Sequence, residues 1–315
     1  MEQHRIRHVT RYTYPAPVAD SANQIMLYPL NDAQQRVLRQ TVSISGKPAV
    51  ELFADYFGNT VGTFTVIAPH RELIIDSSLE VQTEAAAIPP DGGGAAAQWE
   101  RIREISRAFP YLDFLTPSRS TSRKEILEVA RAALLPARSP LEVINDLSAY
   151  VHEHLQYRKG VTTVETSVDE VWNLKAGVCQ DFAHLLLFML RGAGIPARYV
   201  SGYVCPKNHD MRGEGATHAW VEAFIPDFGW LGIDPTNNSL VGERHVRLAV
   251  GRGFSDCTPV KGTYKGSGQH TLEVSVVIEN GFQSDEALPE FSYTVTKSEP
   301  NTNSYRRYLE AQQQQ

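Results

Sequence analysis

The apolar residues that follow Cys179 fall at helical spacing (Phe182, Leu185, Leu186, Met189 and Leu190). An i, i+3, i+4, i+7 stripe of this kind predicts a helix with one buried face. Its end is marked by Arg191, by Gly192 and Gly194, and by the proline beyond them. We therefore expect Cys179 to be the first residue of a helix that its own core face holds in place.

The start of the chain has a different pattern, in which apolar and polar residues alternate. Alternation over residues 8–14, 37–44, 60–67 and 73–81 predicts short β-strands, and residues 57–59 have the residues of a turn. Several short strands bounded by turns are typical of a β-sandwich or a partly open barrel. We expect residues 1–84 to form an N-terminal β-rich domain.

A run rich in alanine, proline and glycine separates this region from the rest. We interpret residues 85–98 as a linker, although an ordered loop is the alternative. Residues 99–298 are then expected to form an α+β domain. Residues 299–315 end in four glutamines and are expected to be a flexible tail.

Two helices are predicted before Cys179. Ser122 and Glu125 have the spacing of a capping box at the start of the first. The second follows Ser139 and Pro140, because proline suits the first helical turn.

Two strands are predicted after the helix that Cys179 opens. Residues 217–224 are β-branched and aromatic, and residues 230–234 end before Pro235, which cannot continue a central ladder. Turn residues lie between them, so the two strands are expected to form an antiparallel hairpin. That pairing brings His218, near the start of one strand, close to Asp234, at the end of the other.

Cys179, His218 and Asp234 together have the residue types of a nucleophile, a base and a group that orients the base. The positive end of the helix dipole favours an anion at its N-terminus, which stabilises a thiolate there. Taken singly, each residue has a plainer interpretation: a buried small side chain, a core histidine and a turn residue. Asp181 and His184 follow on the same helix, and we expect them to hold the helix N-terminus or to lie buried behind the site.

Composition narrows the function classes. The chain has 315 residues, 42% of them hydrophobic, and a net charge of −6, which argues against a nucleic-acid binder. It has no apolar run of the roughly 18 residues that a membrane helix needs, and its first residues do not resemble a signal peptide. Three distant cysteines do not form a disulfide framework, so we expect a cytoplasmic protein. Cys179, Cys205 and His209 lack the spacing of a zinc site, and we expect neither a metal nor a cofactor.

Three blocks in this order resemble the transglutaminase-like cysteine enzymes, a branch of the papain-like class. The blocks are residues 177–184 (Gly-Val-Cys-Gln-Asp-Phe-Ala-His), 197–203 (Ala-Arg-Tyr-Val-Ser-Gly-Tyr), and 218–222 (His-Ala-Trp-Val-Glu) with 229–236. The first 84 residues look like the β-rich N-terminal domain of bacterial members. The resemblance implies an α+β catalytic domain with its nucleophile helix packed on an antiparallel sheet. One departure is Gly253, where relatives tend to carry an acidic residue.

The resemblance further implies Cys179 as nucleophile, His218 as base and Asp234 as orienting residue, acting on a protein or peptide substrate. The Cys179 backbone N–H would be one oxyanion donor, and Gln180, Trp172 and Tyr157 are candidates for the second. We expect hydrolysis of peptide or isopeptide bonds slightly more than transamidation. Two alternatives stay open: an inactive peptide-binding module, and an acyltransferase that uses thioester donors.

Overall fold

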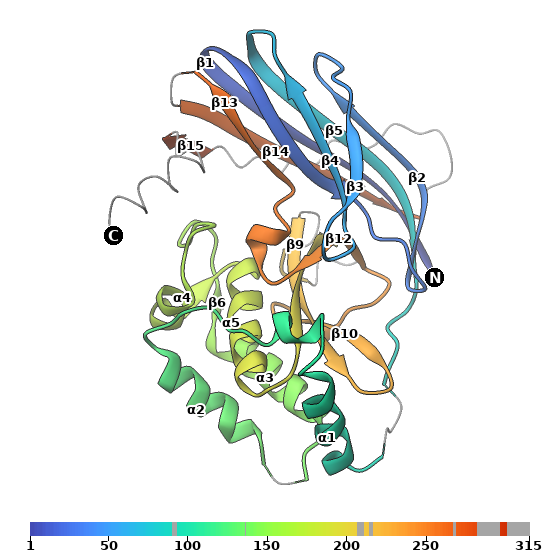
Figure 1. Ribbon diagram of the computed structural model, residues 1–315, viewed down its shortest axis with the longest axis vertical. Coiled ribbons are helices and arrows are strands. Elements are labelled where there is room, and N and C mark those ends of the chain that lie inside the picture. The colour runs from blue at the N-terminus through green and yellow to red at the C-terminus, as the bar shows by residue number, and fades with distance from the viewer. Residues whose placement is uncertain are drawn as a thin grey trace. The chain divides into compact units, whose positions relative to one another are not determined.

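The computed structural model describes residues 1–89, 93–135, 137–206, 211–213, 217–266, 269–281 and 297–300. The chain divides into two compact units (Figure 1). The β unit comprises Glu2–Gln82 and Thr258–Gln315, and the α+β unit comprises Thr83–Cys257. The predicted α+β class is confirmed, with a β-rich N-terminal part followed by a part in which helices pack on a sheet.

The β unit is built around one long strand, β1, to which strands from both ends of the chain pair. The first half of β1 pairs with β14 (Ile6 opposite Ile278), and its second half pairs with β4 and β13. Alternate residues of β5 are buried, so one face of the sheet forms the core. The strands are β1 (Glu2–Tyr28), β2 (Gln35–Ile44), β3 (Glu51–Ala54), β4 (Thr60–Val66), β5 (His70–Thr83), β13 (Val260–Lys265), β14 (Gln269–Asn280) and β15 (Lys297–Pro300).

The predicted domain ranges differ from this division in three places. Residues after Thr258 pair with β1 and belong to the β unit, not to the predicted domain 99–298. The last four residues of the predicted linker 85–98 are helical, because helix α1 begins at Ala95, where alanine favours helix. Of the predicted tail, residues 299 and 300 end β15, and 301–315 lie outside the described residues.

The α+β unit packs its helices on a sheet of order β11-β10-β9-β8-β12. Helix α5 is central and contacts β8, β9, α2, α3 and α4. The helices are α1 (Ala95–Ile105), α2 (Arg123–Ala133), α3 (Pro140–His154), α4 (Val168–Leu174) and α5 (Cys179–Gly192), with short 3-10 helices at Tyr111–Phe114 and Phe254–Asp256. The strands are β6 (Gln156–Tyr157), β7 (Ala176–Gly177), β8 (Ala197–Val204), β9 (Thr217–Ile225), β10 (Gly229–Asp234), β11 (Ser239–Leu240) and β12 (His245–Gly251).

Helix α5 begins at Cys179, as predicted, but it is buried on every side rather than on one face. Residues 185–190 are all buried, including Leu187 and Phe188 from the side predicted to be exposed. A helix that is apolar all round belongs in a protein core, so the position of Cys179 is fixed by packing in every direction.

The helix starts are only partly as predicted. Ser139 forms a complete capping box with Glu142, with Pro140 in the first turn. Ser122 makes no side-chain cap, and its backbone N–H donates instead to Asp169, 2.8 Å away. The predicted capping box at Ser122 is therefore wrong, because a carboxylate from α4 takes over the role.

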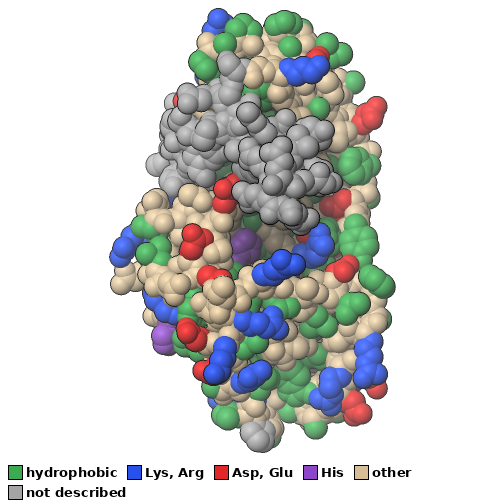
Figure 2. All heavy atoms as spheres, turned by 60° about the vertical axis from the view of Figure 1, so that its left-hand side comes forward, with side chains coloured by type: hydrophobic (Ala, Val, Ile, Leu, Met, Phe, Trp, Pro, Cys, Tyr) green, Lys and Arg blue, Asp and Glu red, His purple; other side chains and the backbone are tan. Residues whose placement is uncertain are grey.

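No helix within the described residues has the length and apolar character to cross a membrane. On the face drawn in Figure 2, basic and acidic side chains are interspersed with apolar ones. The expected cytoplasmic location and the expected partners stay predictions.

Candidate active site

Cys179 opens α5 with its side chain half-buried. The turn before it is held by Asp181, whose carboxylate accepts hydrogen bonds from Val178 N at 2.7 Å and from Thr162 Oγ1 at 2.7 Å. Burial raises the pKa of Asp181, against the lowering effect of these two bonds. Asp181 therefore holds the helix N-terminus, as expected, and leaves the sulfur of Cys179 to project from it.

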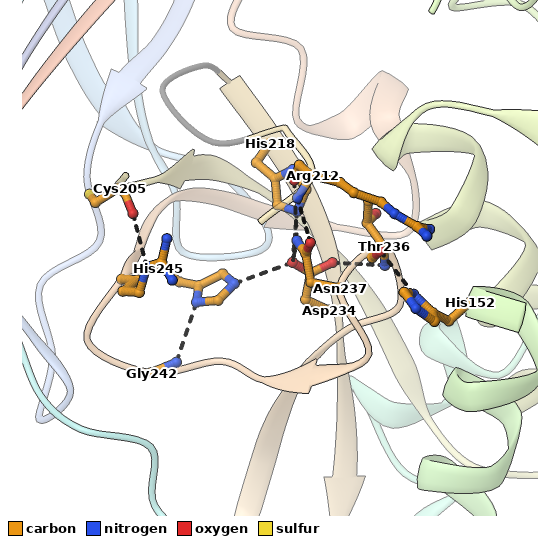
Figure 3. Close-up of polar contacts among 10 residues, drawn as sticks. His152, Cys205, Arg212, His218, Asp234, Thr236, Asn237, Gly242 and His245 are labelled. Atoms are coloured by element: carbon orange, nitrogen blue, oxygen red, sulfur yellow. Dashed lines mark hydrogen bonds and ion pairs between the residues drawn. The ribbon is translucent and has the colours of Figure 1, made fainter. Parts of the chain in front are cut away.

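His218 and Asp234 are paired inside the sheet (Figure 3). The imidazole Nε2 lies 2.8 Å from Asp234 Oδ2, and the two residues are 2% and 0% exposed. The predicted hairpin is present, since β9 and β10 are antiparallel with Ile233 opposite Val221. The hairpin therefore places the two side chains in contact, as the sequence predicts.

The Asp234 carboxylate has further donors around it (Figure 3). Oδ1 accepts from Thr236 N at 2.9 Å, and Oδ2 accepts from Asn237 Nδ2 at 2.7 Å. His245 Nε2 lies 3.4 Å from Oδ2, while its Nδ1 accepts from Gly242 N. Because a carboxylate buried without donors would be neutral, this set keeps Asp234 charged.

The buried pair is polarised. Burial opposes the charged form of His218, but the Asp234 carboxylate and the Cys179 sulfur outweigh it and raise the pKa of His218 to about 10. Burial likewise favours neutral Asp234, yet His218 and His245 hold its pKa far below the usual range. Burial lowers the pKa of His245. Asp234 is thus an anion, with a protonated His218 on one side and a neutral His245 on the other.

The second nitrogen of His218 is the one left for Cys179. Nδ1 is buried and has no hydrogen bond of standard geometry within the described residues. The Cys179 sulfur is near enough to act on the ring. Since Nε2 already donates to Asp234, Nδ1 is the atom that could exchange a proton with the sulfur.

Gly213 lies against this nitrogen. A Cβ atom built on Gly213 would be 2.9 Å from His218 Nδ1 and 3.4 Å from the hydroxyl of Tyr157. Gly213 also has φ +77°, a conformation that L side chains rarely adopt. Gly213 therefore lies directly against His218 Nδ1, with the hydroxyl of Tyr157 nearby.

The three candidate oxyanion donors have different surroundings. Gln180 Nε2 donates to Val164 O at 3.2 Å, and Trp172 Nε1 donates to Glu125 at 3.0 Å. Both donors are thus engaged elsewhere. The Tyr157 hydroxyl lies beside Gly213, which contacts His218 Nδ1, and this position near the base is the reason to keep Tyr157 as the candidate.

His184 lies one turn further along α5 and away from the proton-transfer groups. Its Nε2 accepts from Phe254 N at 3.2 Å, and its ring contacts Tyr199. Burial, followed by the charge of Arg191, lowers the pKa of His184 to about 4. A Cβ atom on Gly253 would lie 3.6 Å from the same nitrogen, so the missing acidic side chain would have been next to His184.

Two family models match the chain. Residues 128–235 match the transglutaminase-like superfamily, and residues 4–82 match the bacterial transglutaminase-like N-terminal region. The first range contains Cys179, His218 and Asp234. An uncharacterized protein of Mycobacterium tuberculosis is 36% identical over 292 residues, which is 87% of this chain and 91% of that protein. The chain belongs to the transglutaminase-like superfamily.

This transglutaminase-like chain is also similar to a solved structure and to a second protein in sequence. The crystal structure of a "putative cysteine protease" from Cytophaga hutchinsonii has a TM-score of 0.67 at 18% identity, covering 95% of this chain and 98% of that one. It shows that the two share a fold. A protein-glutamine gamma-glutamyltransferase of Pseudomonas aeruginosa is 37% identical over 97 residues, which is 29% of this chain and 14% of that protein.

Sequence reasoning missed several residues around the transglutaminase-like site. Asn237, His245 and Arg212 are assigned no role from the sequence. Asn237 could have been noticed because it follows Asp234 closely in the sequence, whereas His245 arrives from a distant strand. Among the described residues no cluster of ligating side chains could hold a metal ion, and His209 lies outside them.

Proposed function

We propose that this transglutaminase-like protein is a cysteine-nucleophile acyl-transfer enzyme that acts on peptide or isopeptide amide bonds. Cys179 is the nucleophile, His218 the general base and acid, and Asp234 the residue that orients the imidazole. The observation that supports this most is the buried pair of His218 and Asp234 at 2.8 Å, which leaves Nδ1 of the same imidazole for the nearby Cys179 sulfur. This is the arrangement that a nucleophile, base and orienting group require.

In the first step the thiolate of Cys179 attacks the amide carbonyl carbon. A C–S bond forms and the carbonyl oxygen becomes an oxyanion. The Cys179 backbone N–H at the helix N-terminus is one donor to it, and the Tyr157 hydroxyl is the second. Each such donor typically lowers the barrier by about 3 kcal/mol.

In the second step the C–N bond breaks. The protonated His218 gives its Nδ1 proton to the departing amine, and a thioester remains on Cys179. Water, deprotonated by the same nitrogen, then attacks the thioester and releases the acid. An incoming amine in place of water would give transamidation. We favour hydrolysis, in line with the description of the Cytophaga hutchinsonii neighbour as a cysteine protease.

The proposal is tested by trapping the acyl-enzyme. The full chain is quenched in acid during turnover of a peptide library, and the adduct mass on Cys179 is read by mass spectrometry. Cys179→Ala should form no adduct and turn over nothing, while Cys205→Ala, which changes a buried cysteine, should still form it. Full turnover by Cys179→Ala would end the proposal.

The same experiment separates the two alternatives. An inactive binding module predicts no adduct from any donor and an iodoacetamide reaction that rises only near pH 8, as for an ordinary thiol. An acyltransferase predicts an adduct from thioester donors but none from peptides.

A further inference from the structure

Arg212 is anchored to the proposed catalytic carboxylate through a single side chain. Arg212 N donates to Asn237 Oδ1 at 2.7 Å, and Asn237 Nδ2 donates to Arg212 O at 3.2 Å. The same Nδ2 donates to Asp234 Oδ2 at 2.7 Å (Figure 3). The Arg212 backbone is therefore fixed relative to the pair of Asp234 and His218.

The next residue, Gly213, brings this segment directly against the base. A Cβ atom added to Gly213 would lie 2.9 Å from His218 Nδ1, as described above. Gly213 thus lies beside the nitrogen that would give a proton to a departing amine, and Arg212 is the residue before it. In the proposed mechanism, the part of the substrate attached to that amine would pass along residues 212 and 213.

The Arg212 side chain is half-buried, and one nitrogen of its guanidinium has no acceptor within the described residues. Nη1 is buried and has no hydrogen-bond partner within the described residues. Figure 3 draws the side chain leaving the segment on the side of Thr236 and His152. An arginine held only by hydration would keep its nitrogens in water, whereas a buried donor without a partner is costly and is seldom left so.

A carboxylate is the group that a guanidinium binds best, because two parallel N–H groups match its two oxygens. We infer that Arg212 binds a carboxylate on the leaving side of the substrate, so that the preferred substrates carry a negative charge on the residue directly after the scissile amide. That charge is either the free α-carboxylate of a terminal residue or an acidic side chain. This inference rests on the proposed function, since it places the leaving group beside His218.

Binding can be measured without turnover in the full chain carrying Cys179→Ala. Three probes are compared by calorimetry: N-benzoyl-glycyl-glycine, its C-terminal amide, and N-benzoyl-glycyl-aspartic acid α-amide. They carry an α-carboxylate, no charge and a side-chain carboxylate, respectively. A charge-assisted bidentate contact predicts that at least one acidic probe binds about tenfold tighter than the neutral amide. The probe that gains more identifies which carboxylate Arg212 takes.

Matched variants then assign the preference. In the Cys179→Ala background, Arg212→Met should bring the acidic and neutral probes to equal affinity, and Arg212→Lys should keep part of the difference. Arg103→Met, which removes an exposed arginine from α1, should leave the difference unchanged. Equal binding of all three probes, no measurable binding of either acidic probe, or a preference that survives Arg212→Met would each overturn the inference.

The outcome is separate from that of the proposed function. Acyl-enzyme trapping with Cys179 intact reports whether the site performs chemistry, whereas the probes report only whether Arg212 binds a carboxylate. If adducts were trapped from neutral and acidic peptides alike and all probes bound equally, the proposed acyl transfer would be supported. The proposed binding of a carboxylate by Arg212 would be refuted.

Discussion

Replacing Asp234 with asparagine should remove the reactivity of Cys179 at mildly acidic pH. The carboxylate oxygen Oδ2 accepts from His218 Nε2 and from Asn237 Nδ2, and His245 Nε2 lies 3.4 Å away. An asparagine that keeps its oxygen on Thr236 N, where Oδ1 is now, would turn an NH₂ group toward these donors. His218 would then have to accept at Nε2 and carry its proton on Nδ1, which is the wrong tautomer for a base facing the sulfur.

The size of the effect follows from the state of the pair. In the wild type, Asp234 and Cys179 raise the pKa of His218 to about 10 despite burial, so the imidazolium persists below that pH and presents its positive charge to the Cys179 sulfur. Without the carboxylate, only the Cys179 sulfur still opposes the effect of burial on the ring, and the pKa of His218 falls. An ordinary cysteine is only about 0.3% ionised at pH 6, so the alkylation rate at this pH should fall about 100-fold, after allowance for the lower nucleophilicity of a stabilised thiolate.

The assay is iodoacetamide alkylation between pH 5 and pH 10. Cys205 and Cys257 are each 0% exposed, so the folded chain should be labelled at Cys179 alone. Cys179→Ala provides the blank. Donors left without an acceptor destabilise a buried site by about 1–3 kcal/mol each, so the melting temperature is recorded with every rate. A folded Asp234→Asn variant that is alkylated at pH 6 at the wild-type rate would refute the reasoning.

Three further predictions concern residues around this pair. Asn237→Ala should lower kcat/KM about tenfold, the loss expected for one hydrogen bond to a charged group; an unchanged value in a peptide-cleavage assay would contradict it. Gly213→Ala should slow alkylation of Cys179 by pressing on His218, whereas Gly160→Ala, with the same φ of +77° and open space around its Cβ, should not; equal rates in the two variants would show that the contact is unimportant. The pKa of His184 is lowered to about 4 in the folded chain. As the pH falls below about 6.5, the unfolded chain therefore binds a proton at this residue before the folded chain does. The free energy of unfolding should for this reason be about 2 kcal/mol lower at pH 5 than at pH 7. The His184→Gln variant should not show this loss of stability. Urea unfolding followed by tryptophan fluorescence measures it in the α+β unit, because all four tryptophans lie there. An identical loss in the variant would exclude His184 as its source.

The three proposed catalytic residues could be found from the sequence because each stands at the end of an element with a local signal. Cys179 precedes an apolar stripe, and Pro235 ends the strand that carries Asp234. A hairpin between adjacent strands has few alternative pairings, so proximity of His218 to Asp234 followed from the turn between them. The tie from Asn237 to Arg212 did not follow, because it depends on where a loop backbone passes.

The sheet that the C-terminal strands join could not be predicted in the same way. Residues 272–278 alternate clearly, but alternation says that a strand has one buried face and not which sheet it joins. β14 pairs with β1, about 270 positions earlier, with Val276 opposite His8. β1 runs for 27 residues and pairs with other strands along both of its halves. The alternation within β14 does not show that one of these halves is its partner.

The same reasoning explains why the carboxylate, rather than the sulfur, is the most constrained group of this site. Cys179 needs only a helix N-terminus and partial exposure, which α5 supplies by itself. Asp234 is fully buried and stays charged only because donors from its own turn and from His218 surround it, with His245 close by. Those donors come from three segments, the turn at 236–237, strand β9 and strand β12, so a shift in any of them changes the charge that holds the imidazole. Loss of activity in variants far from the sulfur should therefore appear as a changed state of His218 before it appears as a loss of fold.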